Sequence, residues 1–224
     1  MQPFFLFLRK HFHQIQRADL YIFMDNAQFV KNAHHNRNRI KGSNGYIWLT
    51  VPVKHNFGQM INQVTIDNNQ KWKKKQLSSI TQSYSKAPYF KSYIGFFKDV
   101  YTRDWNKLCD LNIHLIKHIS EFLGIKNTEF ATLSDLSIKT SQNPTQRLID
   151  ICEYVGASNY IIGTRAKDYM EEWRWGKTKV NLEYFEPDYP AYPQLYGEFI
   201  DNCAIIDLLF NCGYESGKYI WKKI

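Results

Sequence analysis

One helix, one tight turn and one strand follow each other in a short stretch, and this unit constrains the fold more than any other feature of the chain. Asn143 is a good N-cap, Pro144 occupies the first turn, and Gln146 stands where a capping box needs it. Gly156 ends the helix, and the apolar strand 159–162 starts almost at once. Because so little chain separates them, the helix and the strand must pack as one unit, which is typical of α/β proteins.

The same alternation continues along the rest of the chain. Apolar residues at helical spacing predict helices, and β-branched and aromatic runs beside turn residues predict strands. Pro52 has no amide proton to donate, so its strand ends there or lies at an edge. No repeat or long linker divides the sequence, which predicts one α/β domain over residues 1–224 with a helical sub-lobe at about 70–125. We expect helices at 11–17, 70–84, 91–102, 104–123, 144–155 and 204–210, and strands at 19–24, 46–53, 63–66, 159–162 and 180–185.

Charge and hydropathy exclude several classes of protein. The net charge of +8 accompanies a richness in Lys, Asn, Ile and Tyr, a bias that AT-rich genomes impose, so nucleic acid is a weaker expectation than a small anionic substrate. The longest apolar runs are short, and Asp207 interrupts one of them, which excludes a span of about 20 apolar residues. The N-terminus lacks the pattern of a secretory signal, and the four cysteines lie too far apart for a zinc cage or a disulfide framework. We therefore expect a cytoplasmic protein.

The first candidate site follows the strand 19–24, because ligands bind at the carboxyl ends of strands in open α/β sheets. Arg37 and Arg39 are two residues apart, so in an extended segment they face the same side, and their guanidinium groups suit phosphate or carboxylate. A solvated basic loop is the alternative. The polar candidates of this segment are Asp25, Gln28, Lys31, Asn36, Arg37, Asn38 and Arg39.

Further candidates lie elsewhere. Gln2 belongs to an opening segment that is either a loop into the first helix or a frayed terminus. His34 and His35 are potential general bases, of which only one can face the site if the segment is extended. His114 and His118 have metal-ligand spacing on a helix but lack a third ligand, so we expect no metal site there. Gly163 follows a strand, and its turn, with Asp168 and Tyr169, either cradles an anion or is structural.

Motifs along almost the whole chain resemble the WbqC-like protein family. They include Met-Gln-Pro-Phe-Phe at 1–5, Asp-Asn-Ala-Gln-Phe at 25–29, Asn-Arg-Asn-Arg-Ile at 36–40, Trp-Leu-Thr-Val-Pro-Val-Lys at 48–54 and Tyr-Ile-Ile-Gly at 160–163. The family is associated with bacterial O-antigen and other surface-polysaccharide gene clusters. The resemblance implies an acyl or aminoacyl (glycine-type) transferase that acts on the amine of a nucleotide-linked amino sugar.

The chain also departs from the family pattern. Asn26 replaces the second residue of a common Asp-Asp pair, which favours binding over acid–base chemistry at that position. Members commonly begin several residues earlier, with a short apolar strand before Met-Gln-Pro, whereas here Met1 starts the motif, so a misassigned start or a missing first strand is expected. The order of loop, helix and strand at the N-terminus also resembles the first βαβ unit of nucleotidylyltransferases, which implies a Rossmann-like sheet with flanking helices.

The resemblance implies a role for each candidate residue. Asp25 would anchor the ligand or act as a base, His34 would be a second base, and Gln28 would bind a sugar hydroxyl. Lys31, Arg37 and Arg39 would hold the diphosphate. Gln2, Asn36, Asn38, Gly163, Asp168 and Tyr169 would complete the substrate site, with an acyl-carrier thioester or an aminoacyl ester as donor and no cofactor or metal assigned. The alternative is a non-catalytic basic module that binds nucleic acid or a partner protein through Arg37, Arg39, Lys41 and Lys73–Lys75.

Overall fold

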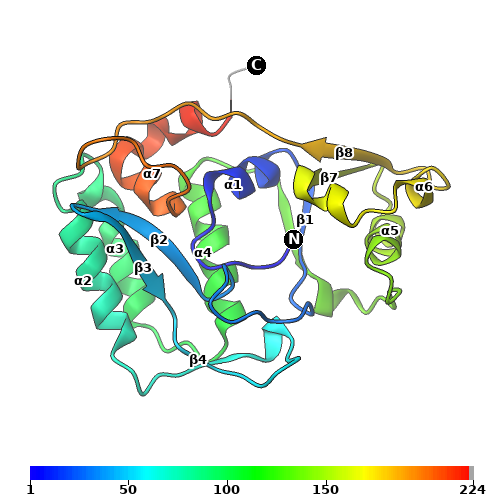
Figure 1. The fold of residues 1–224 in the computed structure, drawn as a ribbon, viewed down its shortest axis with the longest axis horizontal. Coiled ribbons are helices and arrows are strands. Elements are labelled where there is room, and N and C mark those ends of the chain that lie inside the picture. The colour runs from blue at the N-terminus through cyan, green and yellow to red at the C-terminus, as the bar shows by residue number, and fades with distance from the viewer. Residues whose placement is uncertain (222–224) are drawn as a thin grey trace.

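The computed structural model describes residues 1–221, and their fold mixes helices and short strands (Figure 1). The expected α/β class is confirmed. Among these residues, no helix has the length and apolar character needed to cross a bilayer. The helices are α1 (Arg9–Gln16), α2 (Trp72–Tyr84), α3 (Phe90–Thr102), α4 (Leu108–Phe122), α5 (Pro144–Tyr154), α6 (Glu172–Trp175) and α7 (Ile205–Cys212). The strands are β1 (Leu20–Phe23), β2 (Arg37–Gly42), β3 (Gly45–Thr50), β4 (Val53–Lys54), β5 (Thr65–Ile66), β6 (Glu129–Thr132), β7 (Asn159–Gly163) and β8 (Asn181–Phe185).

The strands form small sheets in place of one continuous Rossmann-like sheet. Within residues 1–221 there are four pairs: β1 with β6 and β7 with β8 are parallel, whereas β2 with β3 and β4 with β5 are antiparallel. Strands β2 and β6 are not predicted by the sequence. The Arg-Asn-Arg start of β2 lacks an apolar alternation, and β6 is short with its side chains partly exposed, so neither carries a strand signal.

Two separate hydrophobic cores organise these elements. The main core contains α1, α7, the β2–β3 hairpin and all three helices of the expected sub-lobe at 70–125, through side chains such as Ile80, Phe97 and Leu115. The smaller core, which includes Leu148 and Trp175, joins α5, α6, β7 and β8 on the right of Figure 1. A smaller packing unit therefore lies near 144–185, and the helices at 70–125 contribute to the main core.

Helix α5 forms as its sequence signals predict, with one difference. The Asn143 side chain accepts a hydrogen bond from the Gln146 amide (2.9 Å), and Pro144 occupies the first turn. Gly156 adopts φ +66°, a conformation that favours glycine. The side chain of Gln146, however, donates to Asp150 (3.0 Å) instead of returning to Asn143, so only half of the capping box forms.

Candidate basic groove

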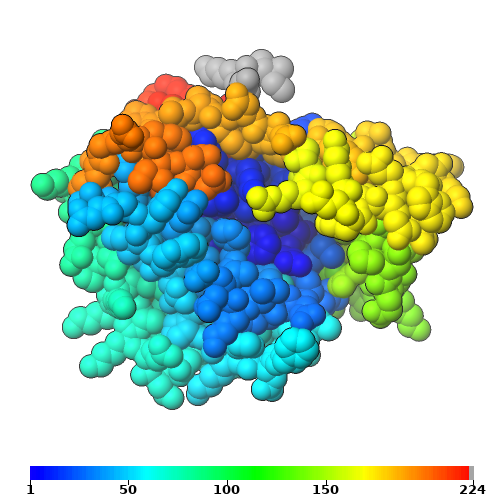
Figure 2. Space-filling model, in the orientation of Figure 1, coloured from blue at the N-terminus to red at the C-terminus, as the bar shows by residue number. Residues whose placement is uncertain are grey.

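A groove of about 1370 Å³ lies between the two cores. Figure 2 shows the hollow, with the N-terminal segment as its floor and residues near 40, 165 and 200 around it. Its wall includes the start of α1, the edge of β1, the end of β7 and the loop at Asp201–Asn202. The groove is therefore built where the opening segment meets elements from the far end of the chain.

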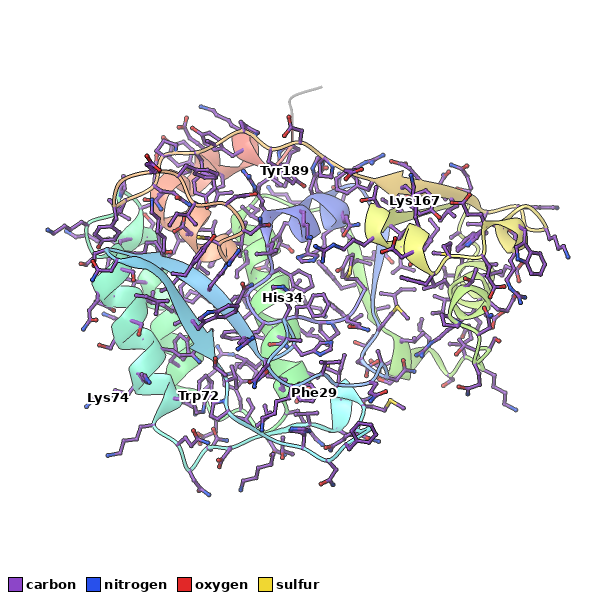
Figure 3. The ribbon with its side chains drawn as sticks, in the orientation of Figure 1. Phe29, His34, Trp72, Lys74, Lys167 and Tyr189 are labelled. Atoms are coloured by element: carbon purple, nitrogen blue, oxygen red, sulfur yellow. The ribbon has the colours of Figure 1, made fainter. Side chains whose placement is uncertain are left out.

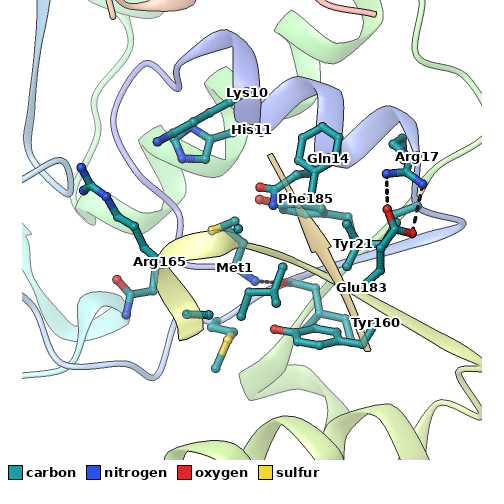
Figure 4. Close-up of a pocket in the computed structure, with 18 of the residues that line it drawn as sticks. Met1, Lys10, His11, Gln14, Arg17, Tyr21, Tyr160, Arg165, Glu183 and Phe185 are labelled. Carbon is teal, nitrogen blue, oxygen red and sulfur yellow. Dashed lines mark hydrogen bonds and ion pairs between the residues drawn. The ribbon is translucent and has the colours of Figure 1, made fainter. Parts of the chain in front are cut away.

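Basic side chains gather at the mouth of this groove. Lys10 starts α1 and Arg165 follows β7, and Figure 4 shows both reaching toward the same opening. The pKa of Lys10 is lowered by burial and then by Arg165. The pKa of His34 is lowered by burial and then by Lys10, Arg39, Arg165 and Arg37, so these groups lie within electrostatic reach of one another. We call Lys10, His34, Arg37, Arg39 and Arg165 the basic cluster; it attracts anions. Lys10 and Arg165 line the groove, whereas His34 (Figure 3), Arg37 and Arg39 do not line it.

The local structure at the start of α1 fixes Lys10. His11 is buried, and its Nδ1 accepts a hydrogen bond from the Leu8 amide (3.2 Å). Burial and the neighbouring Lys10 lower the pKa of His11 to about 3, which keeps the ring neutral. No side-chain hydrogen bond caps the helix at Leu8, so the positive end of the helix dipole adds to the charge of Lys10, which lies in the first turn. Both features favour an anion at this point.

Gln2 is held in place by His35 rather than by His34. His35 is buried, and its Nδ1 accepts from the Val30 amide (3.0 Å), which leaves the hydrogen on Nε2. Nε2 therefore donates to Oε1 of Gln2 (2.8 Å). Because Gln2 lines the groove, this bond orients its side-chain NH₂ group for a ligand acceptor. Burial lowers the pKa of His35, so the ring stays neutral in this role.

Arg37 and Arg39 lie on one face of β2, as expected for an extended segment. Their guanidinium carbons stand 4.4 Å and 3.8 Å from the ring centroids of Trp48 and Tyr46, respectively. Arg39 also donates from Nε to the Asn202 carbonyl (3.3 Å), at the rim of the groove. Both arginines thus keep hydrogen-bond donors available for an anion.

Asn36 and Asn38, expected as ligand contacts, are corrected to structural residues. Both are buried. Asn36 donates to the Val51 carbonyl (2.9 Å) and accepts from the Asn32 amide (3.0 Å), whereas Asn38 donates to the carbonyls of Phe5 (3.2 Å) and Leu6 (2.6 Å). Buried backbone groups need such partners, so these amides hold the opening loop instead of facing a ligand.

Asp25 also faces the protein interior. It is 2% exposed, and its carboxylate accepts from the Ser134 amide and hydroxyl and from Nδ2 of Asn62 (2.9 Å). The prediction that the Asp25 carboxylate faces a ligand at the end of β1 is therefore wrong. Its neighbour Asn26 accepts a hydrogen bond from Arg147 of α5, which ties the two packing units together.

The remaining candidates divide between the groove and the surface. Gly163 and Tyr169 line the groove with Gln2, whereas Gln28, Lys31 and Asp168 are exposed and do not line it. Lys10 and Arg165 are site residues that the sequence patterns do not single out, and His35, a predicted candidate base, instead orients Gln2. Position is the available signal: Lys10 lies in the first turn of a helix after a loop, and Arg165 comes two residues after Gly163 at a strand end.

The histidine pair on α4 has a packing role. The rings of His114 and His118 lie 4.0 Å apart and both stack on Phe96. Within residues 1–221, no three His, Cys, Asp or Glu side chains are grouped as a metal site would require.

The inner part of the groove has a different character. It is lined by Tyr21 and Ile22 of β1 and by Ile161 of β7. The amino group of Met1 donates to the Ile22 carbonyl (2.8 Å), and the Met24 amide donates to the Met1 carbonyl (2.8 Å). Met1 therefore pairs with β1 as a parallel strand would. Its amino group is buried, which lowers the pKa to about 5.

Comparison with known proteins agrees with the motif resemblance. The model of the WbqC-like protein family matches residues 2–219, nearly the whole chain. An uncharacterized protein of Mycobacterium tuberculosis is 33% identical over 216 residues, which cover 95% of this chain and 92% of the relative. No solved structure gives a significant match.

Proposed function

This chain belongs to the WbqC-like protein family, and from this premise we propose that it is an enzyme of surface-polysaccharide assembly. Its reaction would be the transfer of an acyl or aminoacyl group to the amine of a nucleotide-linked amino sugar. The observation that carries the proposal is the basic cluster, which places Lys10 and Arg165 in the groove wall and Arg39 on Asn202 at the rim. A nucleotide-linked sugar presents a diphosphate next to a polar ring, which matches cations beside a polar groove.

The groove offers a place for each part of such a substrate. The diphosphate lies among Lys10, Arg165, Arg37 and Arg39, which supply both charge and directed hydrogen bonds. The NH₂ group of Gln2, oriented by His35, donates to a sugar hydroxyl. This arrangement directs the sugar into the groove and keeps the phosphates at its mouth.

The chemistry requires a free amine and a proton acceptor. The sugar nitrogen attacks the carbonyl carbon of the thioester or ester donor, a C–N bond forms, and the thiol or alcohol leaves with the amine proton. His34 is our candidate for the group that moves this proton, since its lowered pKa leaves it unprotonated at neutral pH. Asp25 is then a structural residue, which fixes the loop after β1 to Ser134.

A transfer assay tests the proposal. The protein is incubated with a uridine-diphosphate-linked 2-amino sugar and glycyl-pantetheine thioester, and the glycylated sugar is detected by mass spectrometry. His34→Asn should lower turnover by about 10²–10⁴, and Lys10→Ala with Arg165→Ala should weaken sugar-nucleotide binding by at least about tenfold. Lys167→Ala, an exposed residue of the same turn as Arg165, is the matched control and should behave as wild type.

Two results would contradict the proposed function. If the wild-type protein has no measurable affinity for the sugar nucleotide, the proposal is wrong. Tight binding to single-stranded nucleic acid of any sequence, with a steep dependence on salt, would instead support the basic-module alternative.

A further inference from the structure

The β2–β3 hairpin presents two aromatic side chains to the outside. The hairpin turns at Gly42 and Gly45, and Ile47 and Leu49 of β3 point inward. Tyr46 and Trp48, which alternate with them, stay 41% and 49% exposed. We call Tyr46 and Trp48 the aromatic face. Large aromatic rings left this open on a paired strand are available for stacking.

Each ring of the aromatic face carries an arginine that belongs to the basic cluster. Arg37 lies over Trp48 and Arg39 over Tyr46. Neither arginine takes part in an ion pair with the residues that the structure describes. Within residues 1–221 no ion pair neutralises their charges, so each guanidinium can stack on its ring and bind an anion at the same time.

The aromatic face is continuous with the groove. The Tyr46 hydroxyl donates to the Asp201 carbonyl (2.9 Å), and Asp201 lines the groove. The same loop is fixed from the other side, because Arg9 forms an ion pair with Asp201 (2.9 Å). A ligand whose phosphates lie at the basic cluster therefore has an aromatic surface directly beside it.

A second exposed tryptophan, Trp173, shows that exposure alone does not make a ring part of the basic cluster. Trp173 is 58% exposed and has Arg174 and Lys177 within 4.6 Å of its ring centroid. Neither Trp173 nor Trp48 lines the groove, but Arg174 is paired with Glu171. Trp48 differs from Trp173 in that its arginine is unpaired and belongs to the basic cluster.

We propose that Trp48, with Tyr46 beside it, is the stacking platform for the nucleobase of a nucleoside diphosphate. The inference rests on the proposed function, which places the diphosphate at the basic cluster. A flat aromatic surface next to several cations matches a ligand that joins a planar base to a polyanion. Since every base has a π face, the platform selects nucleotides over plain phosphates more strongly than one base over another.

Calorimetry with two ligands separates the platform from the cluster. Uridine diphosphate contacts both, whereas inorganic pyrophosphate contacts the basic cluster alone. Trp48→Ala should weaken uridine diphosphate about tenfold to one-hundredfold and leave pyrophosphate affinity as it is. Trp48→Phe should restore most of the affinity. Trp173→Ala is the matched control, and circular dichroism verifies that each variant is folded.

Each result bears on one of the two proposals. If Trp48→Ala and Trp48→Phe bind uridine diphosphate like the wild type, the platform is wrong while the proposed function stands. If wild type binds neither uridine diphosphate nor pyrophosphate, both proposals are wrong. If a single-stranded oligonucleotide binds more tightly than uridine diphosphate and loses affinity in Trp48→Ala, the aromatic face serves a nucleic acid, which overturns the nucleotide platform.

Discussion

Ser134 donates twice to Asp25, from its hydroxyl to Oδ2 at 2.6 Å and from its amide to Oδ1 at 3.1 Å. This pair joins the end of β1 to the turn after β6, the strand that pairs with β1 in parallel. The carboxylate thus completes the junction between the two strands, and its hydrogen-bonding capacity is used inside the protein.

Replacing Asp25 by Asn should therefore affect stability rather than chemistry. An amide keeps the shape but has one acceptor oxygen, so its NH₂ group would face Ser134 or Nδ2 of Asn62, both of which are donors. We expect a loss of about 1–3 kcal/mol in the free energy of unfolding, measured by urea denaturation. Affinity for uridine diphosphate should stay unchanged in the folded fraction. A large fall in turnover with unchanged stability would instead return Asp25 to the reaction.

The arginines of β2 offer a test of bidentate recognition. Lysine keeps the charge of Arg37 or Arg39 but not the planar fork that matches a phosphate. Each Arg→Lys change should weaken pyrophosphate binding by roughly 1.5–3 kcal/mol, as expected for a charged hydrogen bond. Arg103→Lys, at an exposed residue paired with Asp99, is the control. Calorimetry that finds the double variant as tight as wild type would end the phosphate role of this pair.

The basic cluster also predicts proton uptake. The pKa of His34 is lowered by burial and by four surrounding cations, and a bound diphosphate would offset those cations. The pKa of His34 should then rise, so binding near pH 6 should take up part of a proton. Calorimetric titrations in two buffers with different ionisation enthalpies measure the number of protons taken up on binding. His34→Asn should abolish the uptake, and a wild-type value of zero would place the anion away from His34.

The sequence predicts those parts of the fold that local signals determine. Helix α5 is correct because Asn143, Pro144 and Gly156 act within their own turns. Strand β2 is missed because its pairing with β3 depends on the partner strand rather than on its own Arg-Asn-Arg start. Helical periodicity does not reveal which helices share a core, so the smaller core around Leu148 and Trp175 has no signal in the sequence.

The candidate site could also be predicted only in part from local sequence signals. Lys10 and Arg165 are far apart in sequence, and they meet only because α1 and the turn after β7 line the same groove. Asn36 and Asn38 mislead in the other direction, because an amide that holds a buried backbone looks identical in sequence to one that binds a ligand. Arg37 and Arg39 are placed on one face correctly, since a period of two follows from any extended backbone.

Acid should destabilise the protein through His11. Its pKa is about 3 in the folded state, against 6.5 for an ordinary histidine, because of burial and the neighbouring Lys10. Between these values the unfolded chain binds a proton that the folded protein does not, so stability falls as pH drops from 6.5 toward 3. Each pH unit in this window should remove up to about 1.4 kcal/mol. His11→Gln, which can still accept from the Leu8 amide, should flatten this slope in urea titrations; an unchanged slope would show that His11 is not its source.

The space between β1 and β7 predicts the effect of lengthening the chain at Met1. Met1 already bonds to Ile22 and Met24 as a parallel strand would, and the edges of both strands face the inner groove. Four or five apolar, β-branched residues placed before Met1 would continue this pairing and would turn the buried amine into an amide. Each kcal/mol gained should raise Tm by about 2–4 °C for a chain of this size, and an extension of Gly and Ser of equal length is the control.

The amine supplies a second readout, because its pKa of about 5, below the ordinary 8.0, makes the unextended chain lose stability as pH falls from 8 to 5. The apolar extension should abolish that dependence while raising Tm. If both extensions shift Tm equally, or the apolar one does not shift it, the groove does not accept a strand.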